Sequence, residues 1–207
     1  MNSQIIKFLS LFLCCSLVAE YAVAAPPAPI PQTGQTQSNL AGDDGSLQKG
    51  TIGTNSAARF VAGRGVEANC VTDKQTGLMW VKDLKTIPIK GSATSGSPTT
   101  WQNAIDSISD INVTKKLCGH DDWRLPNIKE LRSLVNYGYG NQLPWLAKNG
   151  FTNLDGNYIW SSTTGYGTPS FSVAAALVVD MYSGGTVGRA DKTETSLGHV
   201  WPVRNLK

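Results

Sequence analysis

The sequence is poor in the side chains that most often bind transition metals. Its 207 residues include two histidines, His120 and His199, and four cysteines. The histidines are not spaced as the His-x-x-x-His pair of a zinc-binding helix. We therefore expect no zinc or copper site, and no other metal or cofactor. Asp43–Asp44 and Asp121–Asp122 offer carboxylates, but neither sequence matches a calcium-binding loop.

The sequence motifs of hydrolases are missing as well. The chain has no Gly-x-Ser-x-Gly motif and no recognisable pair of catalytic carboxylates. A cysteine nucleophile would need a nearby base, which only His120 or His199 could supply. The sequence thus indicates a protein that is not an enzyme. The net charge is also small, +3, which permits an anionic partner but does not predict nucleic-acid binding.

Long apolar runs are absent except at the N-terminus. There, Lys7 precedes an apolar stretch at residues 8–19, and small side chains follow at Ala22–Ala25. This pattern is typical of a secretory signal peptide, here residues 1–25. We expect cleavage near Ala25 and a mature chain without a membrane span, either secreted, periplasmic or at the cell surface.

The rest of the chain divides into a linker and a domain. Residues 26–50 begin with a proline-rich stretch and continue with polar residues, which predicts a tether, stiff at first and then flexible. The compact domain is expected at residues 51–207. Of the four cysteines, only Cys70 and Cys118 lie in it. In an oxidising compartment they would most simply form a disulfide, worth about 4 kcal/mol on the chain-entropy model. Two separate buried thiols are the alternative.

Periodicity in the domain predicts helices early and strands late. A hairpin is expected at residues 71–73 and 78–81, and a long loop at 85–100. Thr99 or Thr100 can cap a helix with the apolar stripe Trp101, Ala104, Ile105, Ile108 and Ile111. Gly-rich residues 137–157 are predicted to be irregular. Strands are expected at residues 158–163, 171–182, 186–190 and 199–204. This order predicts an α+β domain.

Asp122–Leu131 is the most strongly specified stretch of the sequence. Pro126 fixes its own φ and favours an extended residue before it. Asn127 and Glu130 have the spacing of a capping box at the start of a helix. The segment therefore predicts a rigid corner and a second helix within residues 123–135. Arg124 could bind a sulfate or carboxylate, or pair with Glu130 to fix the corner; the apolar neighbours favour the pair.

Several short strings stand in a characteristic order along the chain, at residues 33–36, 42–45, 71–73, 76–80, 100–104, 122–127, 158–163 and 200–204. In this order they resemble one secreted bacterial family, named after the C-terminal domain of a collagen-like adhesin, the Lcl C-terminal domain. The resemblance covers about residues 33–205. For the adhesin itself, the family implies binding of sulfated polysaccharides such as glycosaminoglycans.

The corner also looks like that of C-type-lectin-like folds, which include relatives of the formylglycine-generating enzyme. This likeness implies a compact α+β domain with two helices, a small twisted antiparallel sheet and long loops. The lectin-type calcium strings Glu-Pro-Asn and Trp-Asn-Asp are absent, and a Cys70–Cys118 disulfide would remove the thiols that formylglycine generation needs. The residues that carry the likeness are Trp123, Arg124, Pro126, Asn127 and Glu130.

Two groups of residues are candidates for ligand binding. The first is a set of four cations, Lys115, Lys116, Lys129 and Arg132, which would bind a polyanion if they shared one exposed face; otherwise they are a solvated surface. The second is aromatic. Most of the six tryptophans lie in apolar patterns and are expected in the core, whereas Trp145 and Tyr166 lie in irregular, Gly-rich surroundings and are expected to offer exposed platforms.

The sequence thus favours a secreted or cell-surface binding module that recognises an extracellular glycan or a sulfated polyanion. Two other functions stay open. One is a structural or interaction subunit of a surface appendage or envelope complex, and the other is an enzyme of unrecognised type.

Overall fold

The computed structural model describes residues 31–50, 59–154, 158–165, 175–194 and 198–206, apart from the side chain of Lys115. The predicted signal peptide and Tyr166 lie outside these residues. The α-helices are α1 (Asp44–Leu47), α2 (Trp101–Asp110), α3 (Ile128–Ser133) and α4 (Gln142–Lys148). A π-helical turn, η3 (Ile111–Lys115), continues α2, and short 3₁₀ turns are η1 (Gly65–Glu67), η2 (Leu84–Thr86) and η4 (Leu117–Gly119).

The strands form two four-stranded sheets. The first has the order β1 (Phe60–Ala62), β2 (Cys70–Asp73), β3 (Leu78–Val81) and β8 (Val203–Asn205), and every pair in it is antiparallel. The second has the order β6 (Thr186–Asp191), β5 (Ala175–Asp180), β4 (Tyr158–Thr164) and β7 (Gly198–His199). In this sheet β4 and β7 are parallel.

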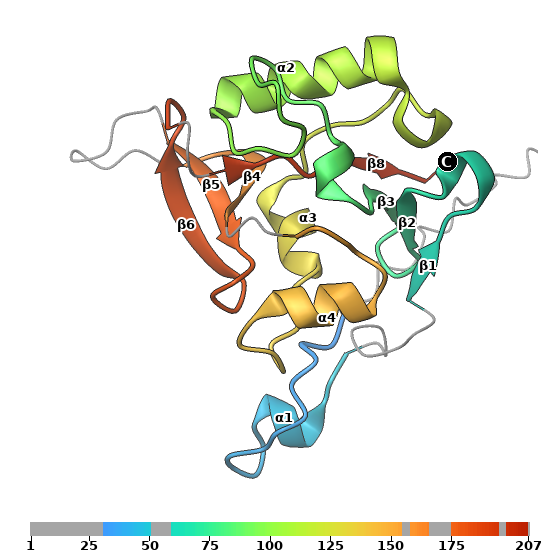
Figure 1. The fold of residues 1–207 in the computed structure, drawn as a ribbon. Helices are drawn as coiled ribbons and strands as arrows, with labels where there is room; N and C mark the ends of the chain where they lie inside the picture. The colour runs from blue at the N-terminus through green and yellow to red at the C-terminus, as the bar shows by residue number, and fades with distance from the viewer. Residues whose placement is uncertain (1–30, 51–58, 155–157, 166–174, 195–197, 207) are drawn as a thin grey trace, which may run out of the picture.

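These elements confirm the predicted α+β class and the β2–β3 hairpin. They correct three details: the described residues contain four α-helices rather than two, two sheets rather than one, and a parallel strand pair. The second helix is shorter than predicted, because its hydrogen-bonding pattern ends at Ser133. In Figure 1, α2 and α4 lie on opposite sides of the molecule with α3 between them, and the two sheets flank α3.

The centre of the core is a group of aromatic rings that joins distant parts of the chain. Trp201 makes edge-to-face contacts with Trp80 of β3 and with Phe151, at centroid distances of 5.6 and 5.2 Å. Its indole N–H donates a 2.8 Å hydrogen bond to the carbonyl of Val81, so its polar atom is satisfied in the interior. All three rings are buried.

Two connections fix the corner residues and η4 to the first sheet. The Cys70–Cys118 disulfide, predicted from the sequence, links β2 to η4. Arg124 exchanges two backbone hydrogen bonds with Val203 of β8, of 2.9 and 3.0 Å. Trp123, next to it, is buried and donates its indole N–H to the carbonyl of Leu117. The corner therefore joins η4, α3 and β8.

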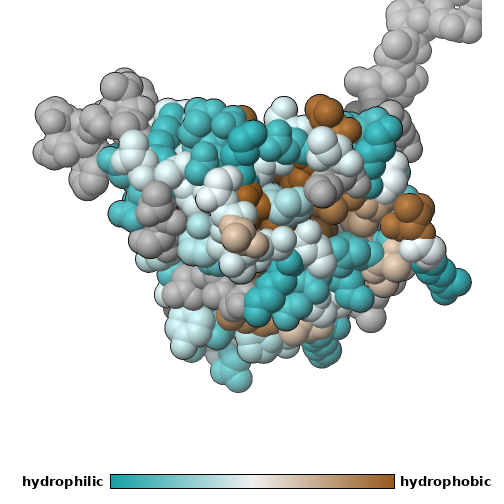
Figure 2. All heavy atoms as spheres, turned by 45° about the horizontal axis from the view of Figure 1, so that its top comes forward, coloured by the Kyte–Doolittle hydropathy of each residue, from teal (hydrophilic) through white to brown (hydrophobic). Residues whose placement is uncertain are grey.

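The surface over α2 is mostly hydrophilic, with apolar groups in a central hollow and in isolated spots (Figure 2). Within the part of the chain that the structure describes, no helix has both the length and the apolar character needed to cross a membrane. The same residues contain no cluster of three or more His, Cys, Asp or Glu side chains suited to a metal ion.

Residues 32–48, which the sequence predicts as part of a flexible tether, form a closed loop around α1. We call this segment the N-terminal loop. Thr33 donates its hydroxyl hydrogen to Asp44, and the Gln32 amide donates to the carbonyl of Gln48. In Figure 1 the loop projects below α4, and its base returns to the domain. The loop forms because its own polar groups are paired, which sequence composition alone does not reveal.

Candidate functional site

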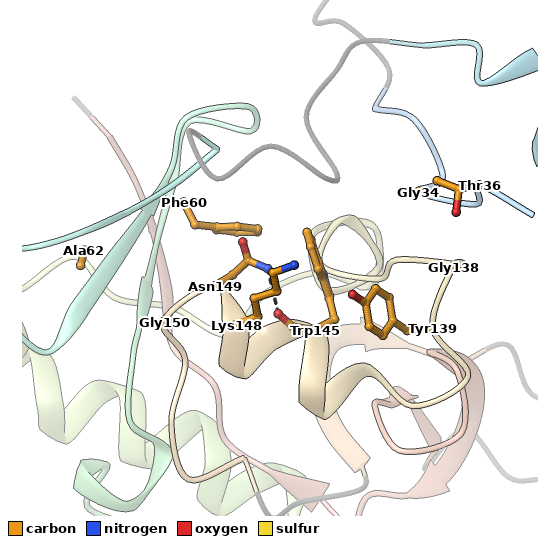
Figure 3. A pocket seen from close by; sticks show the side chains of 10 residues that line it. All are labelled: Gly34, Thr36, Phe60, Ala62, Gly138, Tyr139, Trp145, Lys148, Asn149 and Gly150. Carbon is orange, nitrogen blue, oxygen red and sulfur yellow. Dashed lines mark hydrogen bonds between the residues drawn. The ribbon is translucent and has the colours of Figure 1, made fainter.

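A cleft of about 720 Å³ lies between β1, α4 and the base of the N-terminal loop. This volume is within the usual range of small-molecule sites, roughly 300–1,000 Å³. Figure 3 shows that its residues come from three separate parts of the chain. They are Gly34, Thr36, Phe60, Ala62, Gly138, Tyr139, Trp145, Lys148, Asn149 and Gly150.

Three aromatic residues form one wall of the cleft. Trp145 lies between Phe60, at a centroid distance of 6.3 Å, and Tyr139, at 5.8 Å. Its indole N–H donates to the carbonyl of Leu134. The prediction that Trp145 is an exposed platform is wrong, because these neighbours leave only 3% of it exposed. Tyr139, which is half-buried, offers more of its surface to the cleft than Trp145 does.

Helix α4 positions Trp145 in the aromatic wall and Lys148 and Asn149 at the rim of the cleft. The sequence predicts this region to be irregular, so the helix is a correction. Asn141 caps the helix by accepting a 2.9 Å hydrogen bond from the amide of Leu143. Pro144 fits because it stands in the first turn, where the backbone N–H has no helical partner. In the sequence, Asn141 could have indicated the start of this helix, but the surrounding glycines favour an irregular structure.

The end of α4 directs two polar side chains to the cleft. Gly150 has a φ of +92°, which glycine adopts easily, and the amide of Phe151 then bonds back to the carbonyl of Leu146. This reversal leaves Lys148 exposed and Asn149 half-buried at the rim. The Asn149 amide donates a 2.8 Å hydrogen bond to the carbonyl of Trp145 (Figure 3).

Gln142 is a supporting residue that sequence reasoning missed. It is fully buried. Its side-chain oxygen accepts from the amide of Asn136 at 2.7 Å, and its side-chain nitrogen donates to the carbonyls of Asn136 and Tyr139 at 3.1 and 2.7 Å. These bonds brace the loop that carries Gly138 and Tyr139 into the cleft. A buried glutamine of this kind has no local sequence signal, because its partners are set by the fold.

The predicted cations are separate from the cleft. Lys116 forms an exposed ion pair with Asp121, with 3.7 Å between nitrogen and oxygen. Lys129 and Arg132 are exposed on α3, and Arg132 donates to the hydroxyl of Tyr137. Among the described residues, no hydrogen bond, ion pair or pocket joins Lys116 to the two α3 cations. The predictions for the Lys115 side chain and for Tyr166 fall on parts of the chain that the structure does not describe.

The corner residues pair with one another. Arg124 donates from both terminal nitrogens to the two carboxylate oxygens of Glu130, each at 2.7 Å. Asn127 accepts from the amides of Lys129 and Glu130, and Glu130 accepts from the amide of Asn127, which completes the capping box. Pro126 is buried beside them. The guanidinium of Arg124 is thus paired with Glu130, which is the alternative that the sequence favoured.

A comparison with known protein families agrees with the family resemblance seen in the sequence. Residues 69–204 match the Lcl C-terminal domain. The chain belongs to this family. No curated protein and no solved structure matches the chain, so the likeness to C-type lectins stays a prediction. The Lcl C-terminal domain supplies α4 and the loop before it, whereas Gly34, Thr36, Phe60 and Ala62 come from residues that precede the match.

Proposed function

We propose that this protein is a secreted or cell-surface binding module that holds a saccharide unit of an extracellular glycan in the cleft beside α4. The observation that carries the proposal is the composition of that cleft. It is concave and combines an aromatic wall, a side-chain amide, a lysine and the backbone of three glycines. Such a mixture of apolar and polar groups is typical of sites that bind small polar ligands.

Each component matches one part of a sugar. The apolar C–H face of a pyranose ring packs against an aromatic side chain, and Tyr139 is the most accessible aromatic ring of the wall. The amide of Asn149 and nearby backbone groups suit hydroxyl groups. Lys148, the one charged residue among those lining the cleft, suits a carboxylate or sulfate substituent.

The same composition favours binding over catalysis. The residues that line the cleft include no aspartate, glutamate, histidine or cysteine. These are the side chains that most often act as general acids, bases or nucleophiles. The cleft therefore offers contacts for recognition, and we propose no reaction for it.

The proposal is tested first with the unmodified protein. Immobilised dextran, dextran sulfate and heparin are compared at about 20 mM salt, where charge interactions are weakly screened, and then at rising salt. We expect retention on at least one of the three, with the sulfated polymers released as salt increases. If nothing is retained on these matrices, and a broad glycan array is also negative, the proposal is rejected.

Variants then locate the site. Tyr139→Ala removes the accessible ring, and Tyr182→Ala removes an exposed ring outside the cleft. Lys148→Gln removes the cleft cation, and Lys129→Gln removes a cation of α3. We expect the two cleft variants to weaken binding, Lys148→Gln by about fivefold for a sulfated ligand, the effect of losing roughly 1 kcal/mol of exposed charge pairing. Stronger losses in the two control variants would place the site on α3 or elsewhere.

A structural or interaction subunit is the second candidate, and one observation favours it. Leu40 and Leu47 of the N-terminal loop are 75% and 50% exposed, and exposed apolar side chains on a projecting loop suit contact with another protein. Co-purification of a protein partner that is lost in the Leu40→Ser/Leu47→Ser double variant, together with an absence of glycan binding, would favour this function.

A further inference from the structure

We infer that the base of the N-terminal loop, residues 33–36, is a wall of the cleft that contacts the ligand. The residues that select the ligand therefore extend beyond residues 69–204, the part of the chain that matches the Lcl C-terminal domain. The inference rests on the proposed function, because it concerns the same cleft. It adds that docking of the loop and binding of the ligand stabilise each other, and that Thr36 helps to determine which ligand binds.

The loop has an internal structure that can present its base as a unit. Its two ends are held together by the Thr33–Asp44 and Gln32–Gln48 hydrogen bonds. A Cβ atom on Gly45 would lie 2.0 Å from the carbonyl oxygen of Gln37. The two sides of the loop therefore touch through backbone atoms, as in a compact loop whose ends lie close together.

The base of the loop docks onto the segment that carries the aromatic wall. The amide of Tyr137 donates a 2.8 Å hydrogen bond to the carbonyl of Thr33. A Cβ atom on Gly34 would lie 2.2 Å from the side-chain oxygen of Asn136, and one on Gly138 would lie 2.6 Å from the carbonyl of Gly34. Contact this close requires glycine on both sides, so the two segments fit each other specifically.

Asn136 is not free to move away from Gly34. It is fully buried, and its side-chain oxygen accepts from the amide of Gly138. Its backbone is held by Gln142 at both the amide and the carbonyl. The docking surface is therefore rigid, and the loop must adapt to it.

The base of the loop lines the cleft, so docking of the loop affects ligand binding. Gly34 and Thr36 line the cleft opposite residues of α4, and Figure 3 shows them approaching from a segment separate from Tyr139 and Trp145. A ligand that touches both walls binds the docked state more tightly than the undocked state. By thermodynamic linkage, the ligand must then favour docking to the same extent.

Two glycines of the loop provide a matched test of docking. Gly34 and Gly42 have similar positive φ angles, +83° and +92°, but a Cβ on Gly42 would meet no atom within 4 Å. Gly34→Ala and Gly42→Ala therefore carry the same kind of backbone strain, and only the first disturbs docking. For the glycan that the unmodified protein binds, we expect at least tenfold weaker binding in Gly34→Ala and less than a twofold change in Gly42→Ala.

Hydrogen exchange at the Tyr137 amide reports docking without any ligand. We expect slow exchange in the unmodified protein and in Gly42→Ala, faster exchange in Gly34→Ala, and further slowing when the glycan is added. Equal exchange in all three proteins would overturn the inference. Full glycan affinity in Gly34→Ala despite fast exchange would also overturn it. If Tyr137 is protected as expected but no glycan binds to the unmodified protein, docking is upheld and the proposed function is what fails.

A charge placed on the loop tests selection of the ligand. Thr36→Arg adds a cation inside the cleft, and Gln37→Arg adds the same charge one residue later, outside the residues that line it. We expect Thr36→Arg to raise the preference for a sulfated glycan over its neutral counterpart by severalfold more than Gln37→Arg does. An equal effect of the two substitutions would show that general charge, rather than the loop wall, selects the ligand.

Discussion

Arg124 and Glu130 face each other across the corner in a two-point ion pair, with both nitrogen–oxygen distances at 2.7 Å. The same carboxylate accepts the backbone N–H of Asn127 at 2.8 Å. Arg124 also donates to the side-chain oxygen of Asn205, at 2.7 Å. One carboxylate therefore fixes the start of α3 and, through Arg124, connects it to the end of β8.

Glu130→Ala should lower the free energy of unfolding by about 1–2 kcal/mol. The substitution removes one half of the capping box, and caps of this kind are worth about that much, while the partly exposed ion pair adds little. Denaturant unfolding measures the change. Lys129→Ala, at the preceding residue of the same helix, should alter stability by less than about 0.5 kcal/mol. Equal effects of the two substitutions would contradict the role assigned to Glu130.

Asp73→Ala should be much more damaging. Arg59 donates to Asp73 at 2.8 and 2.6 Å, and both side chains are completely buried. Removal of one partner of a buried pair leaves an uncompensated charge and typically costs about 3–5 kcal/mol. The exposed Lys90–Asp110 pair, at 3.0 Å, is the control, and Asp110→Ala should change stability little or not at all. A small loss in Asp73→Ala would mean that water or another group solvates Arg59.

Gly198→Ala tests the packing beneath the second sheet. A Cβ at Gly198 would lie 2.1 Å from the indole nitrogen of Trp160, which donates to the carbonyl of Thr99 and is wholly buried. We expect a loss of about 1–3 kcal/mol, as for an overpacked core, together with a changed near-ultraviolet signal from tryptophan. Gly140→Ala meets no atom and should leave the melting temperature unchanged or slightly raised. Similar melting temperatures for the two variants would refute this packing.

The N-terminal loop should loosen only in strong acid. Backbone hydrogen bonds from Asn39, Leu40 and Ser46 lower the pKa of Asp43 from 3.8 to about 2. Because the folded form has the lower pKa, the contribution of Asp43 is complete above pH 3.8 and is lost as the pH falls through about 2. The amide signals of Leu40 and Ser46, followed by NMR, should shift with that midpoint. Asp43→Asn should abolish the shift, and a midpoint near 3.8 would show that the carboxylate is not held.

Features that depend on neighbouring residues could be predicted from the sequence. The capping box at Asn127 and Glu130 lies within four residues, and the β2–β3 hairpin is defined by the turn ending at Gly77. The apolar stripe of α2 predicts its buried side, with Ala104 and Ile108 in the core. The Cys70–Cys118 disulfide followed from there being only two cysteines in the predicted domain. The cap, the hairpin and the helix depend on residues close together in the sequence. The disulfide needs no such signal, because the predicted domain holds only one pair of cysteines.

The candidate site could not be found in this way. Trp145 belongs to an irregular-looking stretch, yet it is buried because Phe60, far away in sequence, packs against it. The N-terminal loop is polar in composition, yet its base fits against Asn136 through two glycines. Whether such residues are exposed depends on long-range contacts, which periodicity and composition do not report.

The sequence by itself therefore determined the family, the α+β class and the corner at Arg124 and Glu130. The physical reason is that short-range hydrogen bonds and helical spacing depend on residues that are close together in the chain. The tertiary structure decided which surface can receive a ligand. It buried Trp145, paired Lys116 with Asp121, and assembled a cleft from three distant segments. The physical reason is that a cleft is formed by side chains and backbone brought together only when the core packs.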